Sequence, residues 1–183
     1  MREREPGFES LAKIVVEQAV SQASALAVWG RVVDLLGAVT PVALLTQGED
    51  RLRAAGLSRS KVDCLLGMSR AVDAGVLDLD GLSEASDEEV RGALCALRGV
   101  GRWTADIYLL LALRRRDVWP AHDLALQEAL RVVFRRQKRP SPREADALGM
   151  NMRPHRSTAA ILLWEYYLRE LSPRPSGPSS RRR

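Results

Sequence analysis

The sequence has only two cysteines, Cys64 and Cys95, among its 183 residues. Two thiols are too few for a disulfide framework, a zinc site or a four-cysteine iron–sulfur cluster. The sequence also lacks a signal peptide and any apolar run near the roughly twenty residues of a membrane span. We therefore expect a cytoplasmic protein with no iron–sulfur cluster and no membrane partner.

Segments that alternate polar and apolar residues with the period of a β-strand are also missing. Apolar residues recur instead at helical spacing. The expected helices cover residues 8–20, 24–36, 59–74, 88–97, 124–134 and 155–171, with shorter ones after Thr40 and at 144–148. The sequence thus predicts an all-α fold in a single domain, residues 1–171.

Acidic residues are absent from the last twelve positions, 172–183, which carry four arginines and no apolar residue. This composition predicts a disordered basic tail. The whole chain has a formal net charge of +5, of which the tail contributes four, so residues 1–171 are nearly neutral. Basic clusters at 114–116 and 131–143 remain, and each is either a phosphate-binding surface or a solvated face.

Two glycines, Gly99 and Gly101, separate two helical patterns in the stretch L97-R-G-V-G-R-W-T-A105. Glycine is poor in helix interiors and supplies the positive φ of tight turns, so residues 87–113 should form a helix, a hairpin and a second helix. Backbone N–H groups at the start of the second helix lack intrahelical partners and can bind an anion such as phosphate. The alternative is a tight turn without a ligand.

A second motif, D117-V-W-P-A-H-D123, follows about twenty residues later and leads into a helix that starts near residue 121. Pro120 suits a chain that arrives extended and turns into a helix, which places Asp123 at the N-cap or in the first turn. The helix dipole there favours an ionised carboxylate, able to act as a base or to stabilise positive charge. A plain capping role is the alternative.

Together the two motifs resemble the helix-hairpin-helix, Gly/Pro-rich, Asp superfamily of base-excision DNA glycosylases, and most of all its 3-methyladenine DNA glycosylase II branch. The resemblance covers about residues 8–170. It implies two small helical lobes with an active-site cleft between them. It also implies a monomer that binds duplex DNA containing damaged bases and flips the damaged base out of the stack.

The resemblance also assigns roles to individual residues. Asp123 would be the catalytic carboxylate. The base pocket would be formed by Trp103, Trp164, Gln18, Ile107 and Tyr108. The DNA backbone would contact Gly99, Val100, Gly101, Arg102, Thr104, Arg156 and Ser157. The backbone carbonyls of Cys95, Leu97 and Val100 would hold a monovalent cation. For the tryptophans the alternative is core packing, which we favour for Trp29 and Trp119, and Arg156 could instead brace Asp123.

Position 103 distinguishes two mechanisms. Bifunctional members of the superfamily carry a lysine in this context, and that lysine forms a Schiff base and cleaves the strand. Trp103 cannot do so, which predicts a monofunctional enzyme that leaves an abasic site and needs no cofactor. The resemblance implies that its substrates are alkylated purines such as 3-methyladenine and 7-methylguanine. The alternatives are a non-catalytic DNA-binding protein and a glycosylase for neutral lesions such as hypoxanthine or uracil. Position 19 departs from the family, because small Ala19 stands where a bulky wedge residue is usual.

Overall fold

The computed structural model describes residues 4–172, all of whose regular elements are helical. The α-helices are α1 (Phe8–Glu17), α2 (Gln22–Leu36), α3 (Pro41–Ala54), α4 (Arg59–Asp73), α5 (Asp87–Cys95), α6 (Arg102–Leu111), α7 (Leu124–Val133), α8 (Pro142–Gly149) and α9 (Arg156–Tyr166). Short helical turns are η1 (Gly81–Ser83), η2 (Met150–Met152) and η3 (Tyr167–Leu171). The all-α prediction is confirmed, whereas the predicted disorder of the basic tail falls almost wholly outside the described residues.

Side-chain caps fix the starts of most of these helices. The capping residues, whose side-chain oxygen accepts a hydrogen bond from the third helical N–H, are Ser21, Thr40, Ser58, Ser86, Asp123 and Ser141. Before α5, Glu89 returns the bond to Ser86 and completes the predicted capping box. Helix α1 ends at Glu17, earlier than the sequence predicted, because Gln18 leaves the helical conformation with ψ of 131°, and Ala19 then adopts a left-handed conformation with φ of 54°.

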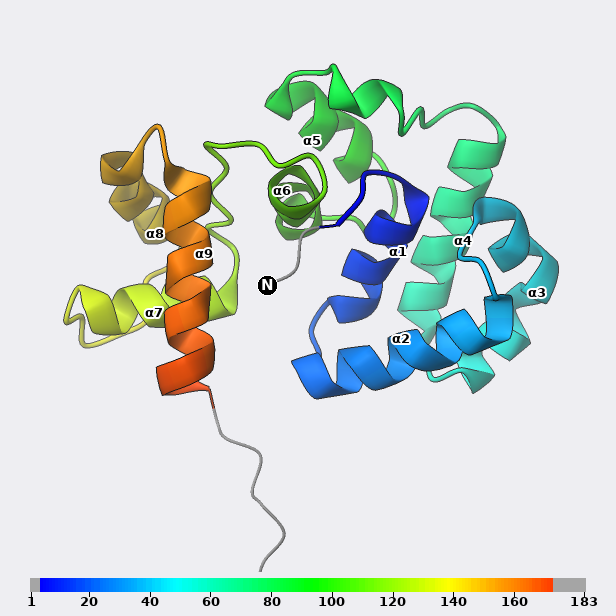
Figure 1. Ribbon diagram of the computed structural model, residues 1–183, viewed down its shortest axis with the longest axis horizontal. Coiled ribbons are helices and arrows are strands. Elements are labelled where there is room, and N and C mark those ends of the chain that lie inside the picture. Colours follow the sequence, from blue (N-terminus) through cyan, green and yellow to red (C-terminus); the bar gives the residue numbers. More distant parts are fainter. Residues whose placement is uncertain (1–3, 173–183) are drawn as a thin grey trace, which may run out of the picture.

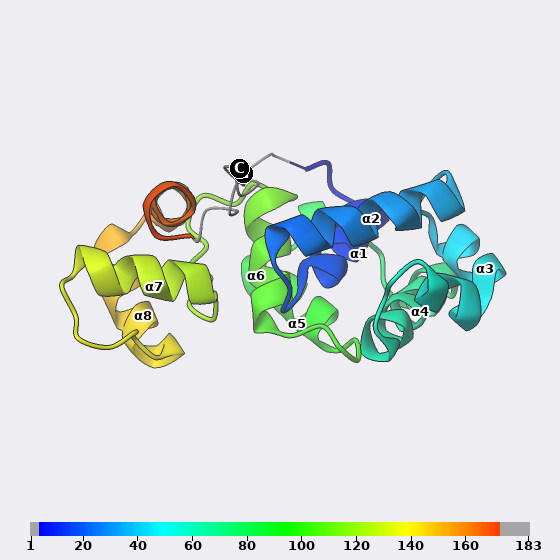
Figure 2. The same cartoon turned by 90° about the horizontal axis from the view of Figure 1, so that it is seen from below.

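The helices form two lobes, visible in two perpendicular views (Figures 1 and 2). The large lobe comprises α1 to α6, which pack on one another, and the small lobe comprises α7 to α9 with η2 and η3. The chain crosses from the large lobe to the small lobe once, through a connecting segment of residues 112–122. Helix α6 lies next to this crossing and packs against both α1 and α5.

Each lobe buries apolar side chains from all of its long helices. The core of the large lobe includes the fully buried Leu11, Ile14, Leu44, Val62 and Leu94, and that of the small lobe includes Leu126, Leu130, Ala145 and Ala160. Trp29 and Trp119 are buried, as the sequence predicted for core residues. Within residues 4–172 no single helix has the length and hydropathy of a membrane span. Helices α2 and α3 have that length and hydropathy only when taken together, and they are bent by 108° relative to each other.

Candidate active site at the junction of the two lobes

Asp123 is the N-cap of α7, with extended backbone angles of −78° and 121°. Its Oδ1 accepts a hydrogen bond of 2.8 Å from the N–H of Leu126, so the prediction of a capping position is confirmed. The carboxylate is partly exposed and stands at the positive end of the α7 dipole. The cap therefore fixes the side chain while leaving part of it accessible.

Two indole N–H groups also converge on this carboxylate. Trp103 of α6 donates to Oδ2 at 2.7 Å, and Trp164 of α9 donates to Oδ1 at 2.9 Å. Hydrogen bonds to an ionised acceptor are shorter and stronger than neutral ones, so three donors hold the carboxylate in one orientation. The bond from Trp103 links the large lobe to the small lobe. The structure thus brings together the three residues that the sequence singled out from separate motifs.

The two tryptophans differ in exposure. Trp103 is partly exposed, whereas Trp164 is 4% exposed and reaches the site chiefly through its N–H. Helix α9 therefore offers little ring surface to a bound base in this conformation. Their roles as pocket walls remain predictions, and Trp103 has the larger accessible face.

The hairpin between α5 and α6 depends on Gly99. This residue has φ of 89°, and a Cβ there would lie 2.9 Å from the Cβ of Cys64. Gly101 has φ of −103° and caps α6 without a side-chain bond, so only Gly99 uses the positive φ expected of the turn. Among the described residues, the N–H groups of Gly101, Arg102 and Trp103 have no hydrogen-bond acceptor. These are the donors that the predicted anion site would use, and anion binding there stays a prediction.

Gln18 lies beside this hairpin, just after α1. Its Nε2 donates to the carbonyl of Gly99 at 3.1 Å and to Oγ1 of Thr104 at 2.8 Å. The amide nitrogen is thus engaged by the protein, which fixes the turn after α1 against the hairpin. Ala19 follows in its left-handed conformation with its side chain exposed. The small methyl group therefore lies at the surface, at the position where the family usually has a bulky wedge residue.

Several predicted contacts on α6 are wrong because the helix is covered on two sides. Ile107 is 1% exposed and Tyr108 is fully buried, with its hydroxyl accepting a hydrogen bond of 2.9 Å from the N–H of Gly7. Neither side chain has surface with which to contact a flipped base. Thr104 is 1% exposed and bonded to Gln18, so it does not reach the DNA backbone. The exposed Gly99, Gly101 and Arg102 and the backbone of Val100 remain predicted phosphate contacts.

The start of α9 is structural. Arg156 donates through Nε and Nη2 to both oxygens of Asp117, at 2.8 and 2.9 Å, and neither braces Asp123 nor points freely to solvent. These bonds lower the pKa of Asp117 to about 2. Ser157 is buried, and its hydroxyl donates to the carbonyl of Arg115 at 2.6 Å. The predicted DNA-backbone role of Ser157 is therefore wrong, and Arg156 is already committed to an ion pair.

An ion pair behind the hairpin was missed at the level of sequence. Arg91 of α5 donates to Asp106 of α6 at 2.7 Å, and Asp106 is 1% exposed. Burial raises the pKa of Asp106, and the bond from Arg91 opposes that shift. The only signal in the sequence was one acidic residue that directly precedes the apolar run of α6. The pair ties together the two helices that form the hairpin.

Within residues 4–172, no three side chains of His, Cys, Asp or Glu lie close enough together to bind a metal ion. The carbonyl of Leu97 accepts a hydrogen bond of 3.1 Å from Val100, which leaves it one further lone pair. The predicted cation held by the carbonyls of Cys95, Leu97 and Val100 therefore stays a prediction.

Two cavities, of about 700 and about 480 Å³, are lined by residues around Lys138 and around Thr40. Neither is lined by Asp123. An open cleft at the carboxylate accordingly remains an expectation.

Comparison with known proteins gives consistent matches. Residues 12–154 match the family described as HhH-GPD superfamily base excision DNA repair protein. DNA-3-methyladenine glycosylase 1 of Schizosaccharomyces pombe is 30% identical over 169 residues, covering 90% of this chain and 74% of the relative. DNA-3-methyladenine glycosylase of Saccharomyces cerevisiae is 30% identical over 65% of this chain but only 44% of its own length.

Solved structures agree with this assignment. The Schizosaccharomyces pombe 3-methyladenine DNA glycosylase in complex with abasic DNA superposes with a TM-score of 0.85 at 26% identity. The match covers 94% of this chain and 86% of that one. The overall fold is thus shared with a solved relative, and the chain belongs to the HhH-GPD superfamily of base excision DNA repair proteins.

Proposed function

We propose that this protein is a monofunctional DNA glycosylase that hydrolytically removes alkylated purines from duplex DNA and leaves an abasic site. The observation that carries the proposal is the Asp123 carboxylate, held by Trp103, Trp164 and the N–H of Leu126. The names of the fission yeast and budding yeast relatives support the same substrate class.

The chemistry follows from the position of Asp123. Breaking an N-glycosidic bond builds positive charge on the sugar, and a fixed carboxylate stabilises that oxocarbenium-like state. The electron pair of the broken bond stays with the base. A water oriented by Asp123 then adds to C1′ and passes its proton to the Asp123 carboxylate, which completes the hydrolysis. The donors around Asp123 hold its charge in place before the reaction begins.

Alkylated purines fit a site with a single catalytic carboxylate. Alkylation of a ring nitrogen makes the base cationic, so the base leaves as a neutral molecule without a general acid. The partly exposed indole of Trp103 offers a π face on which a cationic base can stack. With Ile107 and Tyr108 buried, the pocket has fewer walls than the family pattern implied, and this keeps neutral lesions such as hypoxanthine among the test substrates.

Strand cleavage is not part of the proposal. It would need an amine that forms a Schiff base with the sugar, and position 103 is a tryptophan. Of the three lysines, Lys61 donates to the carbonyl of Val16 at 2.8 Å, and Lys13 lies over the ring of Trp29. No cofactor enters the proposed reaction, and the hairpin cation would be structural.

The test is single-turnover base release from duplexes containing 7-methylguanine, 3-methyladenine or hypoxanthine. The native chain should release the alkylated bases, and Asp123→Asn should slow release by about 100-fold or more while still binding DNA. Borohydride should trap no covalent adduct. Binding without release from any lesion would instead identify a non-catalytic DNA-binding protein, and trapped adduct would refute the monofunctional mechanism.

A further inference from the structure

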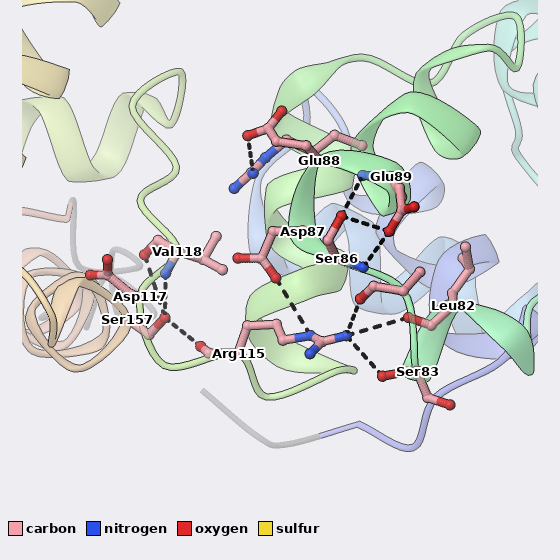
Figure 3. Close-up of polar contacts among 12 residues, drawn as sticks. Leu82, Ser83, Ser86, Asp87, Glu88, Glu89, Arg115, Asp117, Val118 and Ser157 are labelled. Atoms are coloured by element: carbon pink, nitrogen blue, oxygen red, sulfur yellow. Dashed lines mark hydrogen bonds and ion pairs between the residues drawn. The ribbon is translucent and has the colours of Figure 1, made fainter.

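Arg115, in the segment that connects the lobes, contacts both of them: its side chain binds the large lobe, and its backbone carbonyl binds the small lobe. Within residues 4–172 the chain crosses between the lobes only here, so the conformation of residues 112–122 sets how Asp123 faces Trp103. Figure 3 shows the contacts that hold the segment. They come from the start of the hairpin on one side and from the start of α9 on the other.

On the large-lobe side, the guanidinium of Arg115 binds the turn that precedes α5. Its Nη2 donates to the carbonyls of Ser83 at 2.8 Å and Ala85 at 2.7 Å, and lies 3.5 Å from that of Leu82. Its Nε lies 3.5 Å from Oδ1 of Asp87, the first residue of α5. The side chain thus donates hydrogen bonds to a group of carbonyls and forms an ion pair with one carboxylate at the point where the hairpin helices begin.

On the small-lobe side, the backbone of the same segment binds Ser157 in the first turn of α9. Its hydroxyl donates to the carbonyl of Arg115 at 2.6 Å and accepts from the N–H of Val118 at 2.9 Å. The N–H of Ser157 donates to the carbonyl of Arg116 at 3.2 Å. Helix α9 carries Trp164 about two turns later, so these bonds fix the helix that supplies one donor to Asp123.

We propose that Arg115 is a positioning residue that sets the alignment of the two lobes and thereby the bond between Trp103 and Asp123. The inference rests on the proposed glycosylase function. The side chain of Arg115 anchors the helix that leads to Trp103, while its carbonyl anchors the helix of Trp164. Arginine suits the position because its planar fork reaches several acceptors at once, whereas lysine presents a single charged point.

The experiment compares Arg115→Ala and Arg115→Lys with Arg116→Ala in the full chain. Arg116 is the matched control: it is the next residue, its side chain is exposed, and only its backbone carbonyl has a hydrogen bond in the described structure. Single-turnover base release, affinity for an abasic duplex and the melting temperature are measured for each.

Arg115→Ala should slow base release by about 10- to 100-fold, the penalty of a misplacement near 1 Å, with DNA affinity within a factor of about three. Arg115→Lys should recover only part of the rate, because one ammonium group cannot reach all the acceptors of the guanidinium, and Arg116→Ala should match the native chain. Equal rates for the two alanine variants would overturn the proposal, as would a loss that appears only as weaker DNA binding. If Arg115→Ala does not fold, Arg115→Gln, which keeps an amide donor, replaces it.

Hydrogen exchange supplies a readout that does not require activity. The amides of Val118 and Ser157 should exchange faster in Arg115→Ala than in Arg116→Ala, because the segment they belong to loses its anchor. Unchanged exchange at both amides would contradict the proposal. A native chain that releases no base but shows this difference would refute the proposed function and leave Arg115's role in the connecting segment supported.

Discussion

The two lobes support the two oxygens of Asp123 unequally. Oδ1 receives both of its hydrogen bonds from within the small lobe, from Leu126 and Trp164. Oδ2 receives its bond from Trp103, across the junction with the large lobe. The small lobe therefore positions the carboxylate by itself, and the bond to Oδ2 depends on how the lobes are aligned. The small lobe thus holds the reactive carboxylate of Asp123, and the large lobe supplies the donor, Trp103, whose position depends on the alignment of the lobes.

Among the changes that separate the contributions of the two lobes, the largest effect should come from breaking the bond between them. Trp103→Phe keeps an aromatic face but removes the donor to Oδ2, and we expect base release to slow by about 10- to 100-fold, the value of a charged hydrogen bond. Trp164→Phe leaves Leu126 bonded to Oδ1, so its effect should be several-fold smaller. Single-turnover rates with matched DNA affinities measure both. The reverse order would show that the small lobe does not hold the carboxylate on its own.

A smaller effect is expected within the large lobe, at the hairpin glycines. Gly99→Ala forces a left-handed residue and places a Cβ 2.9 Å from that of Cys64, which should destabilise the protein by about 1–3 kcal/mol and weaken DNA binding. Gly101→Ala is the control, because nothing lies within 4 Å of its added Cβ and its φ is −103°. Urea unfolding and duplex affinity are the measurements. Similar losses in both variants would contradict this account of the turn.

The smallest effect concerns the small lobe and pH. The bonds from Arg156 lower the pKa of Asp117 from 3.8 to about 2, so they stabilise the folded state fully above about pH 4 and progressively less as pH falls toward 2. The side chain is 28% exposed, so the contribution is about 1 kcal/mol. Urea unfolding of the native chain and Asp117→Asn should converge as pH falls through this window. A constant difference would show that the ion pair does not stabilise the lobe.

The sequence predicted those parts of the site that depend on local chemistry. Pro120 and the following helix pattern gave the cap at Asp123, and the two glycines gave the hairpin. The resemblance placed Trp103 and Trp164 together, which no local pattern could do because they come from different lobes. The geometry of the carboxylate was therefore largely predictable.

The errors arise where burial depends on distant neighbours. Tyr108 was expected in the base pocket, but α1 and α5 cover α6, and the N–H of Gly7 satisfies its hydroxyl. The contacts of Arg115 could not be predicted either, since backbone carbonyls from a remote turn leave no mark in the sequence. Arg91 and Asp106 meet only because the hairpin folds their helices together.

The hydrogen bonds at Asp123 also limit how the carboxylate can meet a reactant. A carboxylate offers about four lone-pair positions, and three are filled, two on Oδ1 and one on Oδ2. The remaining lone-pair position is on Oδ2, the oxygen that also accepts from Trp103. The three donors therefore leave Asp123 one further hydrogen bond to make, and in the proposed reaction the water that attacks the sugar would take it.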